Sequence, residues 1–126
     1  MIYIDTSVVL AELFAEDHRS PAAMWGEPLI SSRLLQYEVW NRVHARHAGE
    51  SHGEAVRAIL GRTSFVELLP SVLVRALDAF PPGVRTLDGI HLATLHHLRG
   101  AGQAVSLATF DVRMRAAARA LGFEVR

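Results

Sequence analysis

The sequence predicts an α/β fold: a single three-layer α/β/α domain over residues 1–126 with a central parallel sheet of four to five strands. Short apolar runs alternate with helical patterns along the whole chain, an order typical of right-handed βαβ units. A length of 126 residues suits one domain. No repeat, linker or low-complexity tract divides the chain.

Strands are expected where short runs are apolar on both faces, as in a sheet covered on both sides. The first run begins at Met1 and ends at Asp5, and the second is Leu29 to Ser32. Further strands are expected over Phe65–Leu69 and Ala104–Ala108, with a small last strand over Phe123–Val125.

Helices are expected between these strands, where apolar residues recur with helical spacing. The predicted helices cover residues 8–15, 34–48, 53–60, 71–80, 87–98 and 112–121. Four of them end at a glycine (Gly49, Gly61, Gly100 and Gly122). The mostly polar residues 16–28 are expected to form a loop or a short helix.

The composition excludes several function classes. Cysteine is absent, which rules out disulfides and thiolate zinc sites. All thirteen basic residues are arginine, so no lysine is present for a Schiff base or a phosphate-binding loop. The formal net charge is zero, so any nucleic-acid site must be local. No apolar stretch reaches the roughly 20 residues of a membrane helix, and the N-terminus lacks a signal-peptide pattern. A cytoplasmic location without membrane contact is expected.

Four carboxylates fall where a parallel sheet places its sites, beyond the carboxyl ends of the strands. Asp5 follows the first strand directly, and Asp111 lies three residues past the fourth. Asp88 opens a predicted helix, and Glu38 lies one turn inside the helix that follows the second strand. These four residues are the candidate functional groups of the chain.

Each carboxylate also has an ordinary structural explanation. Asp5, Asp88 and Asp111 could cap the helices that they precede or open. Glu38 could pair with Arg42 one turn later on a solvated helix face, a contact that contributes only about 0.3–0.5 kcal/mol.

Two patterns favour an inward orientation of the acids. Glu38 shares a helix face with Leu34, and Asp88 begins a stripe with Leu92 and Leu95. Carboxylates about 4–5 Å apart repel by roughly 3–4 kcal/mol at an effective dielectric constant near 20. They must then bind protons or a cation. Oxygen ligands select a hard ion, Mg²⁺ or Mn²⁺, and such an ion supports hydrolysis of phosphodiesters.

The order of these motifs resembles that of a PIN domain, and more narrowly that of the VapC toxins of bacterial type II toxin–antitoxin pairs. The resemblance covers essentially the whole chain and is most specific over Leu87–Thr94. The motifs that carry it are Ile4-Asp5-Thr6-Ser7, Ile30-Ser31-Ser32 leading to Tyr37-Glu38-Val39, the stretch from Arg85 to Thr94, and Ala108-Thr109-Phe110-Asp111.

The resemblance implies that Asp5, Glu38, Asp88 and Asp111 form one acidic, catalytic pocket that binds Mg²⁺ or Mn²⁺. Asp5 and Asp88 are then the first candidates for direct ligation, whereas the position of Asp111 varies among PIN domains. All four positions are filled here, so nothing in the sequence indicates an inactive copy.

Other polar residues near these motifs have two interpretations each. Ser7 and Thr109 match small hydroxyl positions that orient a carboxylate or a water, although helix capping or turn bonding is an equal alternative. Arg113 and Arg115 could bind RNA phosphates, as could Arg33, Arg42 and Arg85, but a solvated or salt-bridged surface role is favoured for each.

Histidines offer a weaker case for function. His91, one turn after Asp88, could touch substrate, although a structural role is favoured. The pairs His44/His47 and His96/His97 have no obvious third ligand for a metal.

The activity that the resemblance implies is an endoribonuclease in which metal-activated water cuts RNA and leaves a 5′-phosphate and a 3′-hydroxyl. VapC-type toxins cut tRNA or rRNA, usually form homodimers, and are inhibited by a cognate VapB-like antitoxin. A non-toxin RNA-processing PIN nuclease and a catalytically silent PIN scaffold remain alternatives. A receiver-type signalling module would need a lysine on a late strand, and a haloacid-dehalogenase-like phosphatase would need an aspartate where Ser7 stands.

Overall fold

Five parallel strands form one sheet in the order β3-β2-β1-β4-β5 in the computed structural model, which describes residues 1–126. The strands are β1 (Ile2–Ile4), β2 (Leu29–Ser32), β3 (Thr63–Val66), β4 (Ser106–Ala108) and β5 (Glu124–Val125). The helices are α1 (Thr6–Leu13), α2 (Leu34–Ala45), α3 (Gly49–Gly61), α4 (Pro70–Ala76), α5 (Thr86–Gly100) and α6 (Val112–Ala120), with a 3₁₀ helix at Ala22–Gly26.

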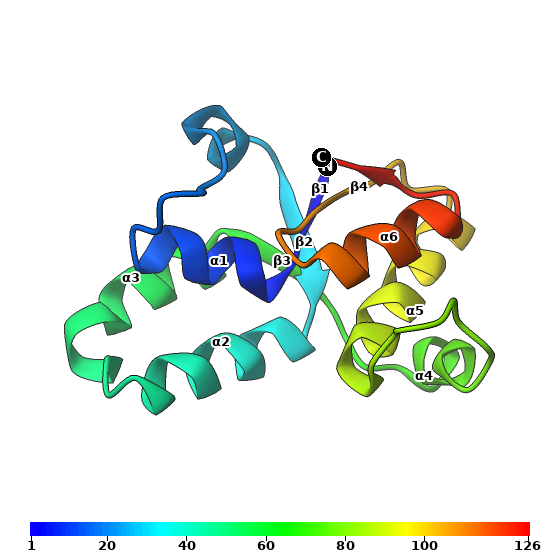
Figure 1. Cartoon of the computed structure of the whole chain (residues 1–126), viewed down its shortest axis with the longest axis horizontal. Helices are drawn as coiled ribbons and strands as arrows, with labels where there is room; N and C mark the ends of the chain where they lie inside the picture. The colour runs from blue at the N-terminus through cyan, green and yellow to red at the C-terminus, as the bar shows by residue number, and fades with distance from the viewer.

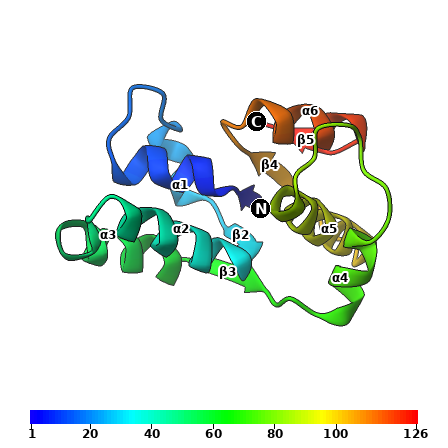
Figure 2. The same ribbon diagram turned by 60° about the horizontal axis from the view of Figure 1, so that its bottom comes forward.

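Helices cover both faces of the sheet, as Figures 1 and 2 show from two directions, and the sheet separates two apolar cores. Side chains alternate across β1: Ile2 and Ile4 pack with residues of α1, α2 and α3, whereas Tyr3 packs with residues of α5 and α6. The predicted three-layer α/β/α architecture with four to five parallel strands is therefore confirmed, with five strands present. None of the helices combines the length and the apolar character that crossing a bilayer requires.

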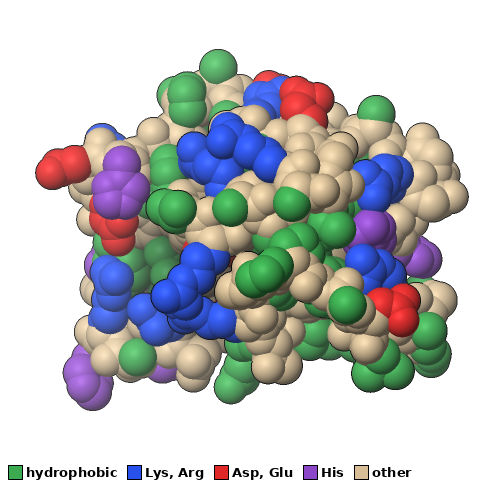
Figure 3. Space-filling view, turned by 45° about the vertical axis from the view of Figure 1, so that its right-hand side comes forward, with side chains coloured by type: hydrophobic (Ala, Val, Ile, Leu, Met, Phe, Trp, Pro, Cys, Tyr) green, Lys and Arg blue, Asp and Glu red, His purple; other side chains and the backbone are tan.

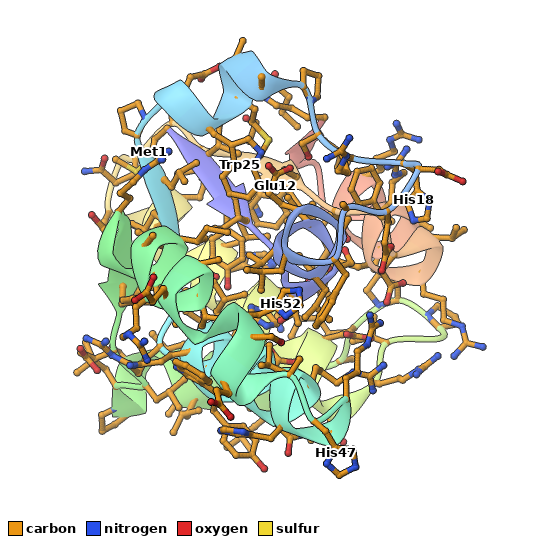
Figure 4. The ribbon with its side chains drawn as sticks, turned by 90° about the vertical axis from the view of Figure 1, so that its left-hand side faces the viewer. Met1, Glu12, His18, Trp25, His47 and His52 are labelled. Atoms are coloured by element: carbon orange, nitrogen blue, oxygen red, sulfur yellow. The ribbon has the colours of Figure 1, made fainter.

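The connection between α2 and α3 differs from the prediction. Gly49 was expected to end the first of these helices, but it begins α3. The residue that takes the left-handed conformation after α2 is His47, with φ of 53°. The side chain of His47 points outward from this turn, away from His18 and His52 (Figure 4). The backbone reversal thus occurs at a residue that pattern reading does not associate with helix ends.

The third strand also begins earlier than predicted. It spans Thr63–Val66, and its last paired residue, Val66, lies opposite Ser32. Because β2 ends at Ser32, the chain beyond Val66 has no neighbouring strand to pair with. Leu68 and Leu69, predicted as strand, are instead exposed ahead of α4.

The centre of the sheet brings distant parts of the sequence together. β1 pairs with β2 on one side and with β4 on the other. At the ends of these strands the backbone N–H of Asp5 donates to the carbonyl of Ala108 at 3.1 Å. Since strand order reverses at β1, its carboxyl end is the position where open α/β sheets form binding crevices.

Helix α4 packs on α5 through a polar contact at His96. The guanidinium of Arg75 lies 3.3 Å from Nε2 of His96, and that of Arg99 lies 3.2 Å from Nδ1. A neutral imidazole accepts only one hydrogen bond, so only one arginine can be bound at a time. Burial, followed by the charges of Arg75 and Arg99, lowers the pKa of His96.

We expect His96→Gln to reduce the loss of stability on acidification. The unfolded chain binds the His96 proton more readily than the folded one, so stability present above about pH 6.5 is lost as the pH falls. Between pH 7.5 and 5.5 the Tm of the wild type should drop by roughly 1–3 °C more than that of His96→Gln. His97→Gln, a neighbouring variant without such contacts, should follow the wild type; equal behaviour of both variants would contradict the assignment.

Candidate active site

A pocket of about 530 Å³ lies at the carboxyl end of β1, between α1, α2 and α5. All four predicted acids line it. Its walls are formed by Asp5, Thr6, Ser7, Leu10, Tyr37, Glu38, Asn41, Arg42, Arg85, Thr86, Leu87, Asp88 and Asp111. Residues that are far apart in the chain therefore meet in one cavity. They come from α1, α2 and α5 and from the residues just before α1, α5 and α6.

Asp5 is held by two hydroxyl groups. Its Oδ2 accepts hydrogen bonds from Ser7 Oγ at 2.9 Å and from Thr109 Oγ1 at 2.8 Å. Ser7 Oγ in turn accepts from the backbone N–H of Phe110 at 2.9 Å. Asp5 occupies the position before α1, but its side chain makes no capping bond. The capping alternative for Asp5 is therefore wrong. Asp5 is buried, with 7% of its surface exposed, and it lines the pocket.

Asp111 both caps a helix and lines the pocket. Its Oδ1 accepts from the backbone N–H groups of Arg113 at 2.8 Å and Met114 at 3.1 Å. Its own N–H donates to Thr109 Oγ1 at 3.0 Å. The capping explanation for Asp111 is thus correct, and it leaves the second carboxylate oxygen without a protein donor.

Glu38 is bound by residues from other elements rather than by its own helix. Its Oε1 accepts from Thr6 Oγ1 at 3.1 Å and lies 2.5 Å from Nε2 of His91. The predicted alternative, a pair with Arg42, does not form, because Arg42 makes no ion pair. The glutamate side chain is 17% exposed, so it reaches solvent only at the pocket.

His91, which contacts Glu38, is a buried polar residue and is itself bound by the buried Tyr3. His91 contacts the hydroxyl of Tyr3 through Nδ1 at 2.6 Å. Burial opposes the charged form of His91, but the hydrogen bond and charge of Glu38, with Asp5 and Asp88 nearby, outweigh it and raise the His91 pKa. Burial also raises the pKa of Tyr3, so its phenol stays protonated.

Asp88 is the acid whose carboxylate is held by the weakest hydrogen bond. It is the third residue of α5, and its Oδ2 accepts only from the backbone N–H of Arg85 at 3.4 Å, a local helix-start contact. Burial raises the pKa of Asp88, and the charges of Asp111 and Asp5 raise it further, against the opposing hydrogen bond and charge of Arg85. Burial is the larger cause of the raised pKa of Asp88, and repulsion from the charges of Asp111 and Asp5 adds to it.

The four carboxylates share one feature that suits a hard cation. Each has one oxygen engaged by protein donors and one without any: Asp5 Oδ1, Glu38 Oε2, Asp88 Oδ1 and Asp111 Oδ2. No three His, Asp or Glu side chains are arranged to hold one ion directly. Mg²⁺ commonly takes one or two carboxylates and keeps several waters, so this donor set fits such an ion.

Two arginines line the same pocket without acidic partners. Arg42 comes from α2 and Arg85 from the residue before α5, and neither forms an ion pair. Tyr37 and Asn41, which the sequence did not single out, stand on the same wall, and Tyr37 is 65% exposed. An aromatic face and two free cations thus border the acids.

The other predicted arginines are placed differently. Arg33 pairs with Glu67 at 2.5 Å, outside the pocket. Arg115 donates to the carbonyl of Thr109 at 2.7 Å, which ties its side chain to the loop after β4. Arg113 is exposed and bonds only through its backbone N–H. Figure 3 shows a larger group of arginine side chains left of the centre of one face and smaller groups at its right and top.

Two further residues near Glu38 were missed from the sequence: Thr6, which donates to it, and Tyr3, which contacts its partner His91. Thr6 belongs to the quoted motif after the first strand but received no role, and Tyr3 was seen only as part of an apolar run. One signal was available for Tyr3: it alternates with Ile2 and Ile4, which places its hydroxyl on the opposite face of the sheet.

The comparisons with known proteins identify the family of this chain. The family model for the PIN domain matches residues 2–120, and the chain belongs to the PIN domain family. It is 33% identical over 127 residues to "Ribonuclease VapC46" of Mycobacterium tuberculosis (strain H37Rv), covering 98% of this chain and 95% of that protein. It is 29% identical over 130 residues to "Ribonuclease VapC47" (98% and 93%) and 30% identical over 131 residues to "Ribonuclease VapC35" (99% and 95%), both of strain CDC 1551. The resemblance seen in the sequence is thereby confirmed.

We expect Asp88→Asn to raise the Tm of the metal-free protein. The substitution removes a charge that Asp5 and Asp111 repel, while the amide oxygen can still accept from Arg85. Because Asp88 is only partly buried, screening keeps the gain below about 1 kcal/mol, or roughly 1–3 °C. Thermal unfolding in EDTA measures it. Asp78→Asn, at an exposed position outside the pocket, is the matched control; a lower Tm for Asp88→Asn would contradict a crowded carboxylate site.

Proposed function

We propose that this protein is a Mg²⁺- or Mn²⁺-dependent endoribonuclease that hydrolyses RNA phosphodiester bonds. The observation that carries the proposal is the pocket in which four carboxylates each keep one oxygen free of protein donors. Membership of the PIN family and similarity to proteins named Ribonuclease VapC support this chemistry. A phosphodiester is the substrate that an all-oxygen divalent site serves best.

Asp5 and Asp88 would hold the ion directly, with Glu38 and Asp111 completing the site through their free oxygens or through water. The ion supplies Lewis acidity that activates water and offsets charge on the phosphate. The protein's part is to keep the free oxygens in place. Ser7 and Thr109 do this for Asp5, and the start of α6 does it for Asp111.

RNA would be held by the groups that border the acids. Arg42 and Arg85 can bind phosphates on either side of the scissile bond, since neither forms an ion pair and both line the same cavity. Tyr37 offers an exposed ring on which an unstacked base can lie. Arg113 can extend this phosphate contact along α6, whereas Arg115 is partly engaged by Thr109.

The biological role proposed is that of a toxin, held in check by a cognate VapB-like antitoxin and acting on tRNA or rRNA as a homodimer in the cytoplasm. Similarity to Ribonuclease VapC proteins over nearly the full length of both chains supports this role. A housekeeping RNA-processing nuclease would use the same pocket, so the two roles are distinguished by whether induction of the protein arrests cell growth.

Asp5→Asn should abolish metal-dependent RNA cleavage. The amide keeps the size of the side chain but removes the charge that attracts the ion, and we expect a loss of at least about a hundredfold. Purified protein is incubated with total RNA and Mg²⁺ or Mn²⁺, then with EDTA, and the cut ends are mapped. Asp78→Asn should cleave like the wild type. Equal cleavage by Asp5→Asn would rule out the proposed site.

The same pair of variants tests the toxin role in cells. Induction of the wild type or of Asp78→Asn should arrest growth, and induction of Asp5→Asn should not. Normal growth with an enzyme that is active in vitro would favour housekeeping RNA processing instead.

Arg42→Ala and Arg85→Ala should each raise the KM for RNA by about tenfold, because a charge-assisted hydrogen bond contributes roughly 1.5–3 kcal/mol. They should also flatten the salt dependence of binding, since each phosphate contact adds about 0.7 to its slope on single strands. Arg119→Ala removes the same charge from an exposed position outside the pocket and is the control. If all three variants lose equal affinity, only general charge matters and the assignment of Arg42 and Arg85 is wrong.

A further inference from the structure

A buried chain of hydrogen bonds runs from the sheet to Glu38. The backbone N–H of Ser32 in β2 donates to the hydroxyl oxygen of Tyr3 in β1 at 3.2 Å. That oxygen lies 2.6 Å from Nδ1 of His91, and Nε2 of His91 lies 2.5 Å from Oε1 of Glu38. The rings of Tyr3 and His91 also pack edge to face, with centroids 5.8 Å apart. Two central strands are thereby linked through α5 to a pocket residue on α2.

The donors along this chain can be assigned from chemistry alone. The N–H of Ser32 can only donate, so the oxygen of Tyr3 accepts there and its hydrogen is available for Nδ1 of a neutral His91. Nε2 then carries the remaining proton and donates to Glu38. In an imidazolium both nitrogens carry protons, and Nε2 still donates to Glu38. Oε1 of Glu38 is therefore occupied in either protonation state of His91.

Packing alone does not explain these two residues. Tyr3 is 0% and His91 1% exposed, and apolar side chains would fill such positions without any hydroxyl or imidazole to satisfy. The chain of contacts begins at the fully buried Ser32 and reaches solvent only through Glu38. The hydrogen-bonded chain therefore meets solvent at the acidic pocket.

Glu38 needs this support more than the other acids do. Asp5 and Asp111 have short side chains and take their donors from residues close in the chain or in the adjoining loop. Glu38 has one more rotatable bond and projects from a helix, where it would sample several rotamers. Thr6 and His91 both bind Oε1, so together they restrict the carboxylate to one orientation.

We propose that Tyr3 and His91 are positioning residues that hold Glu38 through Oε1 and thereby present Oε2 to the divalent ion. The inference rests on the proposed metal-dependent nuclease and deepens it. His91 acts through Glu38, and Tyr3 acts through His91 by keeping the proton of the neutral imidazole on Nε2, the nitrogen that donates to the carboxylate. Outer partners that orient metal ligands change metal affinity or activity by about 10–100-fold when removed.

Three variants separate this role from a contribution to folding. Tyr3→Phe removes the hydroxyl and keeps the ring. His91→Leu removes the donor to Glu38, whereas His91→Gln offers an amide N–H at a similar reach. Val56→Ala, on the buried face of α3 and outside the pocket, is the control for a general loss of stability.

Mn²⁺ affinity by calorimetry, kcat and KM on RNA, and Tm are measured for each variant. We expect Tyr3→Phe and His91→Leu to bind Mn²⁺ about tenfold more weakly and to lose about tenfold in kcat, with KM for RNA unchanged. His91→Gln should lose no more than about threefold in Mn²⁺ affinity and in kcat, which is half of the tenfold loss of His91→Leu on a logarithmic scale. Val56→Ala should lower Tm and leave Mn²⁺ affinity and kcat unchanged. In metal-free wild type, ¹⁵N spectra of histidine should show a proton on Nε2 of His91, and Tyr3→Phe should weaken that preference.

The proposal is overturned if Tyr3→Phe and His91→Leu match Val56→Ala in Mn²⁺ affinity and kcat, or if His91→Gln is as impaired as His91→Leu. An Nδ1 proton alone on His91 in the wild type would overturn it as well. If the wild type binds Mn²⁺ but cuts no RNA, the proposed function fails while the Mn²⁺ affinities still decide the role of Tyr3 and His91. A wild type that binds no Mn²⁺ contradicts both.

Discussion

The gathering of four carboxylates in one cavity is the constraint on which the rest of the site depends. The fold brings Asp5, Glu38, Asp88 and Asp111 to the same pocket, where burial and neighbouring charge raise the pKa of Asp88. The protein limits this cost by giving each carboxylate donors on one oxygen only. The free oxygens keep the negative charge that a divalent ion requires, and the bound ones keep the side chains from turning away from one another.

The donors that restrain the acids come from every layer of the fold. Short hydroxyl side chains next to β1 and β4 hold Asp5, and the backbone at the start of α6 holds Asp111. The buried pair of Tyr3 and His91 carries a hydrogen bond from β2 across the sheet to Glu38. Several of the acids are therefore held from elements of the central sheet and its helices, and a catalytic constellation benefits from such fixed geometry.

Much of the fold follows from local patterns. The second strand and the start of α6 appear where the sequence indicates them, because alternation of apolar runs and a capping aspartate are local signals. Errors occur where a neighbouring element decides the outcome: β3 stops where β2 ends, and α3 begins at Gly49 because His47 makes the preceding turn. The contacts of Glu38 were likewise beyond prediction, since residues 6 and 91 meet it only in space.

By itself the sequence determined the α/β class, the absence of cysteine and lysine chemistry, and the four candidate acids, because each of these depends on residue type and near neighbours. The tertiary structure decided which oxygen of each acid is free, which arginines are left without acidic partners, and that Tyr3 and His91 reach Glu38. Those properties depend on the direction of side chains across the sheet and on contacts between residues up to 104 positions apart, and no local pattern in the chain encodes them.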